Sequence, residues 1–311
     1  MRISVVVPTY GRRELVTKCL GSLAAQRDEQ LDVIVVDDGA DAALGEHVRS
    51  LGLALEIRVI SHATNRGRSA ARNTGIRHAE GDVVAFLDGD MTVVPEWSRC
   101  HRSAHEDGTT VVLGNIVTAP GIARTAFVEY IDTRGVKKVE PGREIPSRYF
   151  MTGNSSVARA LLSAAGGFDE DFREYGGEDT EMGYRLGRFG GRFRYASGAV
   201  SLHWDLNTVP AMARRLRRYG ESMLPILVRK IPEARTDLHL DWVESVDFPR
   251  DGLAGALRKA IARTLCRRSV WAPAAFVADR LPPSLRVDAI FDFVRATAYL
   301  DGYRVSLRRR P

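Results

Sequence analysis

Acidic side chains occur in three short motifs of the sequence, at a spacing that suits metal binding or proton transfer. Asp88 and Asp90 flank a glycine in FLDGDM, Asp38 follows the apolar run of VVDDG, and Glu178 and Asp179 follow two glycines in YGGEDTEMGYRL. Paired carboxylates repel each other unless they share a cation, and their hard oxygen atoms suit Mg²⁺ or Mn²⁺. A single carboxylate beside a hydroxyl group can instead act as a general base.

The FLDGDM motif is predicted to end a buried strand with Asp88 and Asp90. Side chains two residues apart on a strand point to the same side. Gly89 between them would let a ligand approach the backbone. This arrangement favours Mn²⁺ or Mg²⁺ bridging a diphosphate, and the alternative is a turn without a ligand, because Asp and Gly are common turn residues.

Three arginines surround Gly67 in NRGRSAARNTG, at the predicted start of a helix. Arg66, Arg68 and Arg72 could bind a phosphate together with free backbone N–H groups, or form a solvated helix face.

Asp38 could accept a hydrogen bond from a nucleobase or a ribose, or cap a helix. No G-x-x-x-x-G-K-[ST] and no strand-following G-x-G-x-x-G is present here, which argues against a P-loop ATPase and a dinucleotide-binding oxidoreductase.

The YGGEDTEMGYRL motif permits a structural and a catalytic interpretation. In the structural one, Asp179 caps a helix, Glu181 and Arg185 form an i, i+4 ion pair, and Met182 and Leu186 face the core. In the catalytic one, Asp179 takes a proton from a bound hydroxyl group. Both can hold, with Glu181 and Arg185 serving the helix and Asp179 serving the reaction.

Strands and helices alternate along the N-terminal part of the chain. Short β-branched runs that end in polar or glycine residues predict strands, and apolar residues at helical spacing predict helices. The predicted strands cover residues 3–10, 32–39, 55–63, 82–91 and 109–117, and the predicted helices cover 14–26, 67–79 and 95–106. This alternation predicts a mostly parallel sheet with ligands at the carboxyl ends of its strands. Residues 121–146 lack a clear pattern and are predicted to form a mobile loop.

The chain changes character near residue 206. Residues 1–205 hold 25 Lys and Arg against 28 Asp and Glu, whereas residues 206–311 hold 20 against 11. Basic amphipathic helices are predicted at 209–232, 253–270 and 286–310. Their charge could face an anionic partner or simply be solvated. We expect no nucleic acid binding, because no aromatic and basic platform accompanies the charge.

The composition is that of an ordinary globular protein, with 44% apolar and 27% charged residues and a net charge of +6. Cys19, Cys100 and Cys266 lie far apart without zinc-ligand spacing, so neither a disulfide framework nor a zinc site is expected. No apolar run approaches the ~18 residues that span a bilayer, and the N-terminus lacks a signal-peptide pattern. We therefore expect a cytoplasmic protein.

Taken in order, the motifs VVVPTYGR, VVDDGA, NRGRSAARNTG, FLDGDM and GGFDEDFREYGGEDTEMGYRL resemble those of the family 2 glycosyltransferases. The resemblance covers about residues 1–205. It implies a GT-A fold, which is a Rossmann-like α/β architecture with a mostly parallel central sheet flanked by helices. Residues 1–110 would form the nucleotide-sugar-binding half, 111–205 the acceptor-binding and catalytic half, and 206–311 a basic, helical C-terminal extension.

The resemblance also implies roles for individual residues. Asp179 is expected to be the general base of an inverting transfer, with Glu178 contacting the donor sugar or orienting the base. Asp90 and Asp88 are expected to hold Mn²⁺ or Mg²⁺, and His203 either completes that site or is structural. The expected donor contacts are Pro8, Thr9, Tyr10, Arg12, Asp38, Asn65, Gly67, Arg72, Asp88 and Gly89. The expected sugar or acceptor pocket comprises Gly153, Asn154 and Gly177.

The implied activity is transfer of a sugar from a nucleotide sugar, a UDP-sugar in preference, to a hydroxyl group of a glycan, a lipid-linked intermediate or a small natural product. Tyr10 would stack on the nucleobase. The alternatives are a nucleotidyltransferase of related fold and a non-catalytic protein that binds sugar nucleotides or a membrane surface. The basic helices, with Arg214, Arg215, Arg217 and Arg218 beside MLPILV, could contact the inner face of an anionic membrane or form a homodimer.

Overall fold

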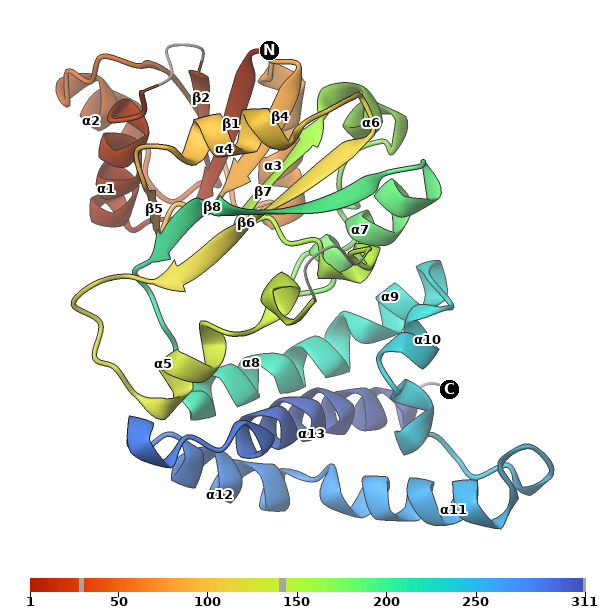
Figure 1. Ribbon diagram of the computed structural model, residues 1–311. Helices are drawn as coiled ribbons and strands as arrows, with labels where there is room; N and C mark the ends of the chain where they lie inside the picture. Colours follow the sequence, from red (N-terminus) through yellow and green to blue (C-terminus); the bar gives the residue numbers. More distant parts are fainter. Residues whose placement is uncertain (28–30, 140–143, 310–311) are drawn as a thin grey trace. The chain divides into compact units, whose positions relative to one another are not determined.

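The computed structural model describes residues 1–27, 31–139 and 144–309 (Figure 1). The chain divides into two compact units, with the main division between Leu206 and Asn207. Unit 1 comprises Met1–Ile122, Arg134–Arg173 and Glu178–Leu206. Unit 2 comprises Ala123–Thr133, Glu174–Gly177 and Asn207–Pro311.

Unit 1 is built from alternating strands and helices. Its strands are β1 (Ile3–Thr9), β2 (Leu31–Asp37), β3 (Glu56–Ser61), β4 (Val83–Leu87), β5 (Met91–Val93), β6 (Thr110–Thr118), β7 (Asn154–Ala158) and β8 (Arg192–His203). Its α-helices are α1 (Arg13–Ala24), α2 (Leu44–Ser50), α3 (Arg68–His78), α4 (Trp97–Ala104), α6 (Arg159–Ala164) and α7 (Glu178–Arg188). Two short 3₁₀ helices are η1 (Gly135–Lys138) and η2 (Ser147–Tyr149).

Within the described residues, these strands form one eight-stranded sheet in the order β3-β2-β1-β4-β7-β6-β8-β5. Pairing is parallel from β3 through β4 and between β6 and β8, whereas β7 pairs antiparallel with both β4 and β6, and β5 with β8. This mixed α/β sheet confirms the predicted fold class. Because the strand order reverses at β1, ligands are expected at the carboxyl ends of β1 and β4.

Helices cover both faces of the sheet. Alternate residues of a strand point to opposite faces. Val5 and Val7 of β1 therefore share a core with α1, α2 and α4, while Val6 shares a core with α3, α6 and α7. β2 is buried along its whole length, as expected for an apolar strand covered on both sides. These two cores fix the strand ends that carry the acidic motifs.

The FLDGDM motif lies at the end of β4, but its two aspartates belong to a turn and not to the strand. β4 ends at Leu87, and a hydrogen bond of 3.1 Å from the Met91 N–H to the Asp88 carbonyl closes a turn before β5. Asp and Gly are poor strand formers, which explains why the strand stops there. The prediction that Asp88 and Asp90 point to one side of a strand is therefore wrong.

The stretch predicted to be a mobile loop contains ordered structure. It includes α5 (Ala126–Ile131), which belongs to unit 2. The rings of Phe127 and Tyr130 are buried against Phe291, with centroids 5.6 and 4.8 Å from it. The loop prediction is wrong here because a helix of six residues is too short to show a periodic pattern. Residues 140–143 of this stretch lie outside the described residues.

Unit 2 is helical. Besides α5 it contains α8 (Val209–Ser222), α9 (Leu224–Lys230), α10 (Ala234–Asp237), α11 (Phe248–Leu265), α12 (Arg268–Ala278) and α13 (Asp288–Leu307), with the 3₁₀ helices η3 (Leu240–Val243) and η4 (Pro283–Leu285). α8, α12 and α13 pack together around Trp271 and Phe291. Among the described residues, no helix combines the length and the apolar character needed to cross a bilayer.

The MLPILV segment lies inside unit 2. Met223, Leu224 and Leu227 are buried, and Arg217 on the preceding helix pairs with the buried Asp301 at 3.2 Å. The possibility that this segment lies on a membrane beside the arginines of α8 is not supported, because these three apolar side chains are buried.

Candidate active site

Arg72 lies at the centre of a cluster of carboxylates. α3 brings its buried guanidinium to 3.2 Å from Asp88 Oδ1 and 3.3 Å from Glu178 Oε1, while Asp179 Oδ1 lies 3.8 Å away. Burial opposes the charge of Arg72, but the three carboxylates outweigh it and raise its pKa. Three carboxylates around one guanidinium leave an excess of two negative charges when all are ionised. Such an excess suits a site that works with a cation.

The first turn of α7 places Asp179 beside Thr152. Oδ1 of Asp179 accepts a hydrogen bond of 2.9 Å from the Thr152 hydroxyl, and Oδ2 accepts one of 3.2 Å from the Thr152 N–H. Removal from bulk water and the charge of Glu178 raise the pKa of Asp179 to about 7, against the opposing effect of Arg72. The Asp179 side chain keeps 28% of its surface exposed. An accessible carboxylate with this pKa can accept a proton near neutral pH.

The rest of α7 follows the structural interpretation of the motif. Arg185 donates two hydrogen bonds to Glu181, of 2.6 and 2.7 Å, and Met182 and Leu186 are fully buried. Asp179 is not the N-cap, because the helix begins at Glu178 and the Asp179 carboxylate bonds to Thr152 instead. The predicted ion pair and core positions are confirmed, and the predicted cap is wrong.

Asp90, in the turn between β4 and β5, lies close to His203 at the end of β8. β5 pairs with β8 so that Met91 lies opposite His203, which brings His203 Nε2 to 3.6 Å from Asp90 Oδ2. Burial disfavours both charges, but their mutual contact outweighs it, lowering the pKa of Asp90 and raising the pKa of His203. Oδ1 of Asp90 is buried and meets no hydrogen-bond donor within the described parts of the chain.

This pair fits a divalent metal. A carboxylate oxygen without a partner and an imidazole nitrogen are donors that Mn²⁺ accepts. In the ranges that the structure describes, no three Asp, Glu, His or Cys side chains converge into a ligand set. Asp88, the other expected ligand, is turned toward Arg72. The remaining metal ligands would therefore come from water or a bound diphosphate.

Asp38 is buried and holds the loop before α3. His62 Nδ1 lies 2.7 Å from its Oδ1, and the N–H groups of Arg66 and Gly67 donate to its two oxygens at 2.8 Å. Gly67 has φ 92°, a conformation that favours glycine. Asp38 thus shapes the predicted nucleotide loop, and its own contact with a nucleotide stays a prediction.

The end of β1 lies against both this loop and the acidic turn. The Thr9 carbonyl accepts a hydrogen bond of 2.9 Å from the Asp38 N–H. A side chain at Gly89 would come within 3.3 Å of the Pro8 carbonyl oxygen. The absence of a side chain at Gly89 therefore lets the turn pack against β1.

Three further expected donor contacts have exposed side chains near these strand ends. Tyr10 and Arg12 follow β1, and Asn65 precedes Gly67 in the loop before α3. Arg12 forms an ion pair with Asp205. These positions are accessible to a ligand, which their proposed role requires.

The three arginines around Gly67 do not form one phosphate site. Arg72 is buried among carboxylates, whereas Arg66 lies 3.4 Å from Glu170 with half of its side chain exposed. Arg68 is also exposed. The predicted joint phosphate site is wrong because α3 turns Arg72 inward. The surroundings of Arg72 favour a role in holding the carboxylates over a grip on the diphosphate.

Asn154 corrects the predicted sugar pocket. It is completely buried in β7, where its Oδ1 accepts a hydrogen bond of 2.8 Å from Trp97 and its Nδ2 donates one of 2.8 Å to the Ala199 carbonyl. No side-chain surface remains for a ligand, so the prediction for Asn154 is wrong. Gly153 does border the acidic cluster, since a side chain there would come within 3.5 Å of Asp88 Oδ2.

Gly176 and Gly177 directly precede α7 in the sequence, with φ 93° and 96°. A side chain at Gly176 would come within 2.8 Å of the Tyr219 ring, so the space beside Gly176 is filled by that ring and not left for a sugar. The role of Gly177 in a sugar pocket stays a prediction.

The sequence motifs did not identify Thr152 as a site residue, although it directly precedes Gly153 in the MTGNSS segment.

Known protein families match the chain over most of unit 1. Residues 4–153 match Glycosyl transferase family 2, and residues 134–203 match the N-terminal domain of galactosyltransferase. The hyaluronan synthase of Pasteurella multocida is 29% identical over 237 residues, covering 65% of this chain and 24% of the synthase. The validoxylamine A glucosyltransferase of Streptomyces hygroscopicus subsp. jinggangensis is 33% identical over 214 residues, covering 59% of this chain and 51% of that protein.

Solved structures share the fold. The mannosyltransferase PcManGT from Pyrobaculum calidifontis, in complex with GDP-Man and Mn²⁺, has a TM-score of 0.62 at 18% identity, covering 100% of this chain and 88% of that one. S. aureus TarS 1–349 in complex with UDP-GlcNAc has a TM-score of 0.56 at 20% identity, covering 99% and 91%. The chain spans only 24% of the P. multocida hyaluronan synthase and 34% of the Escherichia coli chondroitin synthase. The N-terminal part of the chain, over residues 4–153, therefore belongs to glycosyl transferase family 2, and the solved structures share its GT-A fold.

Proposed function

We propose that the protein is a metal-dependent, inverting glycosyltransferase that moves a sugar from a nucleotide sugar, a UDP-sugar in preference, to an acceptor hydroxyl group. The observation that carries this proposal is the position of Asp179. It is an accessible carboxylate with a raised pKa, held by Thr152 and joined through Arg72 to the acidic turn that carries Asp88.

Asp179 acts as the general base. It takes the proton from the acceptor hydroxyl while the acceptor oxygen forms a bond to the anomeric carbon, and the bond from that carbon to the diphosphate oxygen breaks. A single displacement of this kind inverts the anomeric configuration, because attack comes from the face opposite the leaving group. Thr152 orients the carboxylate by bonding to both of its oxygens.

Glu178 and Arg72 position the reacting groups. Arg72 lies closer to Glu178 than to Asp179, at 3.3 against 3.8 Å, so the base is not neutralised by a short ion pair. The second oxygen of Glu178 is buried and has no hydrogen-bond donor in the described chain. Buried polar atoms normally have a partner. This supports a contact between Glu178 and a hydroxyl group of the donor sugar.

Asp90 and His203 would hold Mn²⁺ or Mg²⁺. The bound cation would neutralise the charge that develops on the diphosphate as it leaves. The buried Asp90 oxygen that lacks a donor supports this assignment. PcManGT was solved with GDP-Man and Mn²⁺, and TarS with UDP-GlcNAc, so the donor test must include both nucleobases.

Thermal shift with a panel of nucleotide sugars tests the proposal. A ligand that binds only the native state raises the melting temperature by mass action. We expect a UDP-sugar to raise it in the presence of Mn²⁺, and a chelator to remove the effect. The matching GDP- and TDP-sugars test the nucleobase. If no nucleotide sugar changes the melting temperature with or without metal, the proposal is contradicted.

A further inference from the structure

Helix α11 has two apolar faces, and only one of them is covered. Ala256, Ala262 and Cys266, the last just beyond the helix, are buried inside unit 2. At about 100° per residue, the opposite side of the helix carries a second apolar row. That row is exposed, and it consists of Leu253, Leu257, Ile261 and Leu265. Leu253 and Leu257 are 81% and 61% exposed, whereas the outer face of a helix in a globular protein is normally polar.

Helix α12 also carries exposed apolar side chains. In Figure 1, α11 and α12 follow one another along the edge of unit 2, and both contact α13. Phe276 and Val277 are exposed on α12, and the Arg280 guanidinium lies 3.4 Å from the centre of the Phe276 ring. We name the exposed apolar side chains of both helices the α11–α12 face: Leu253, Leu257, Ile261, Leu265, Phe276 and Val277.

Arginines border this face. Residues 252–278 contain five Lys and Arg and no Asp or Glu, but Lys259 is buried and paired with Asp251, and Arg258 lies 3.4 Å from Asp241. By its helical position, Arg258 lies at one side of the exposed row, and the exposed Arg267 and Arg268 follow the end of the row at the junction of α11 and α12. An apolar row flanked by basic residues is the pattern of helices that lie in the surface of an anionic membrane.

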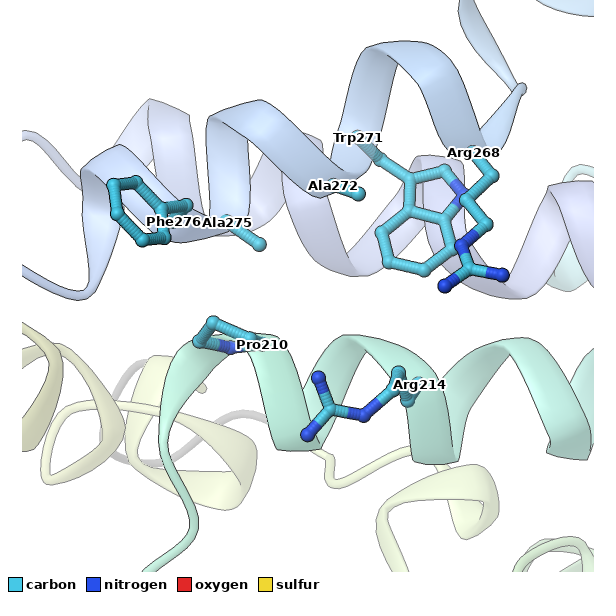
Figure 2. Close-up of a pocket in the computed structure, with 7 residues that line it drawn as sticks. All are labelled: Pro210, Arg214, Arg268, Trp271, Ala272, Ala275 and Phe276. Atoms are coloured by element: carbon cyan, nitrogen blue, oxygen red, sulfur yellow. The ribbon is translucent and has the colours of Figure 1, made fainter.

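A pocket that Phe276 of this face helps to line also combines apolar and basic side chains. It lies between α8 and α12, has a volume of about 140 Å³, and is lined by apolar side chains and two arginines. Figure 2 shows Arg268 and Trp271 on the α12 side of this pocket and Arg214 and Pro210 on its α8 side. Two cations above an apolar lining suit the headgroup of an anionic lipid.

We propose that the α11–α12 face docks unit 2 onto the surface of an anionic lipid bilayer. Apolar patches of this kind are rarely left uncovered without a partner. Self-association through the face would bring the exposed Arg267 and Arg268 of two copies together, which disfavours a second copy as the occupant. The helices lie on the membrane and do not cross it, in keeping with their charge.

Vesicle binding of the full chain tests this proposal without any need for activity. The probes are phosphatidylcholine vesicles with and without phosphatidylglycerol, and binding is measured by co-sedimentation. We expect anionic vesicles to bind at least about tenfold more tightly than neutral ones, and high salt to weaken this binding. Leu257→Glu should reduce binding to anionic vesicles at least about fivefold, and adding Ile261→Glu should abolish it.

Phe189→Glu provides the matched control. Phe189 lies in unit 1, is 52% exposed, and its substitution also replaces one exposed apolar side chain with one negative charge. The control should bind like the wild type, and all variants should keep the wild-type melting temperature because the positions are exposed. Equal binding to neutral and anionic vesicles, absence of binding, or an equal loss in the control would overturn the proposal. So would a dimer in light scattering that Leu257→Glu converts to a monomer.

Discussion

Thr152 bonds to both carboxylate oxygens of Asp179, through its hydroxyl group at 2.9 Å and its backbone N–H at 3.2 Å. Both bonds favour the ionised carboxylate, whereas burial and the neighbouring carboxylates favour the protonated one. The balance leaves the pKa of Asp179 at about 7. A base with this pKa is about half ionised at neutral pH and is still basic enough to accept a proton.

The rate of transfer should rise with pH across neutrality. Asp179 accepts a proton only when it is ionised, and its pKa is raised to about 7. With donor and Mn²⁺ at saturation, kcat should therefore be low below about pH 6 and level above about pH 8. Initial rates of nucleotide release across this range measure the effect. A rate that is independent of pH here would show that another group is the base.

Thr152→Val should move this profile to higher pH. The variant keeps the backbone N–H bond but loses the hydroxyl bond, which is worth about 1.5 to 3 kcal/mol when the acceptor is charged. The loss corresponds to a rise of about one to two units in the pKa of Asp179. Thr152→Ser is the matched control, since it keeps the hydroxyl group and should keep the wild-type profile. A valine variant with an unchanged profile would remove Thr152 from the account.

Much of the fold could be predicted because its signals are local. β-Branched runs with polar ends located β1, β2, β3 and β6 to within a few residues. The cluster around Arg72 could not be found in this way, because its ion pair with Glu178 joins residues 106 apart in the sequence. Which apolar rows are covered also depends on tertiary packing. The buried MLPILV segment and the exposed row of α11 were therefore indistinguishable in the sequence.

Arg72→Met should destabilise the protein strongly. It leaves Asp88, Glu178 and Asp179 without their shared cation, and removing one partner of a buried ion pair costs about 3 to 5 kcal/mol. Arg66→Met is the control, because its pair with Glu170 is exposed and should contribute less than about 1 kcal/mol. Urea unfolding monitored by circular dichroism gives both values. Similar losses in the two variants would contradict the central position of Arg72.

Asp90→Ala and His203→Ala should each weaken nucleotide binding only when metal is present. Both residues are proposed to hold a cation that would bind the diphosphate, so either change should lower UDP affinity at least about tenfold with Mn²⁺. With a chelator, the variants and the wild type should bind equally weakly. Titration calorimetry measures both conditions. If affinity is the same in all three proteins with Mn²⁺, the metal assignment fails.

The role of Asp179 as the general base is the central claim, and Asp179→Asn tests it most directly. The substitution keeps the size of the side chain and removes its ability to accept a proton. The measurement is kcat for nucleotide release from the best donor at pH 8, together with the Kd of that donor. We predict a fall in kcat of about 10²- to 10⁴-fold with a nearly unchanged Kd. A variant that turns over at the wild-type rate would contradict the account.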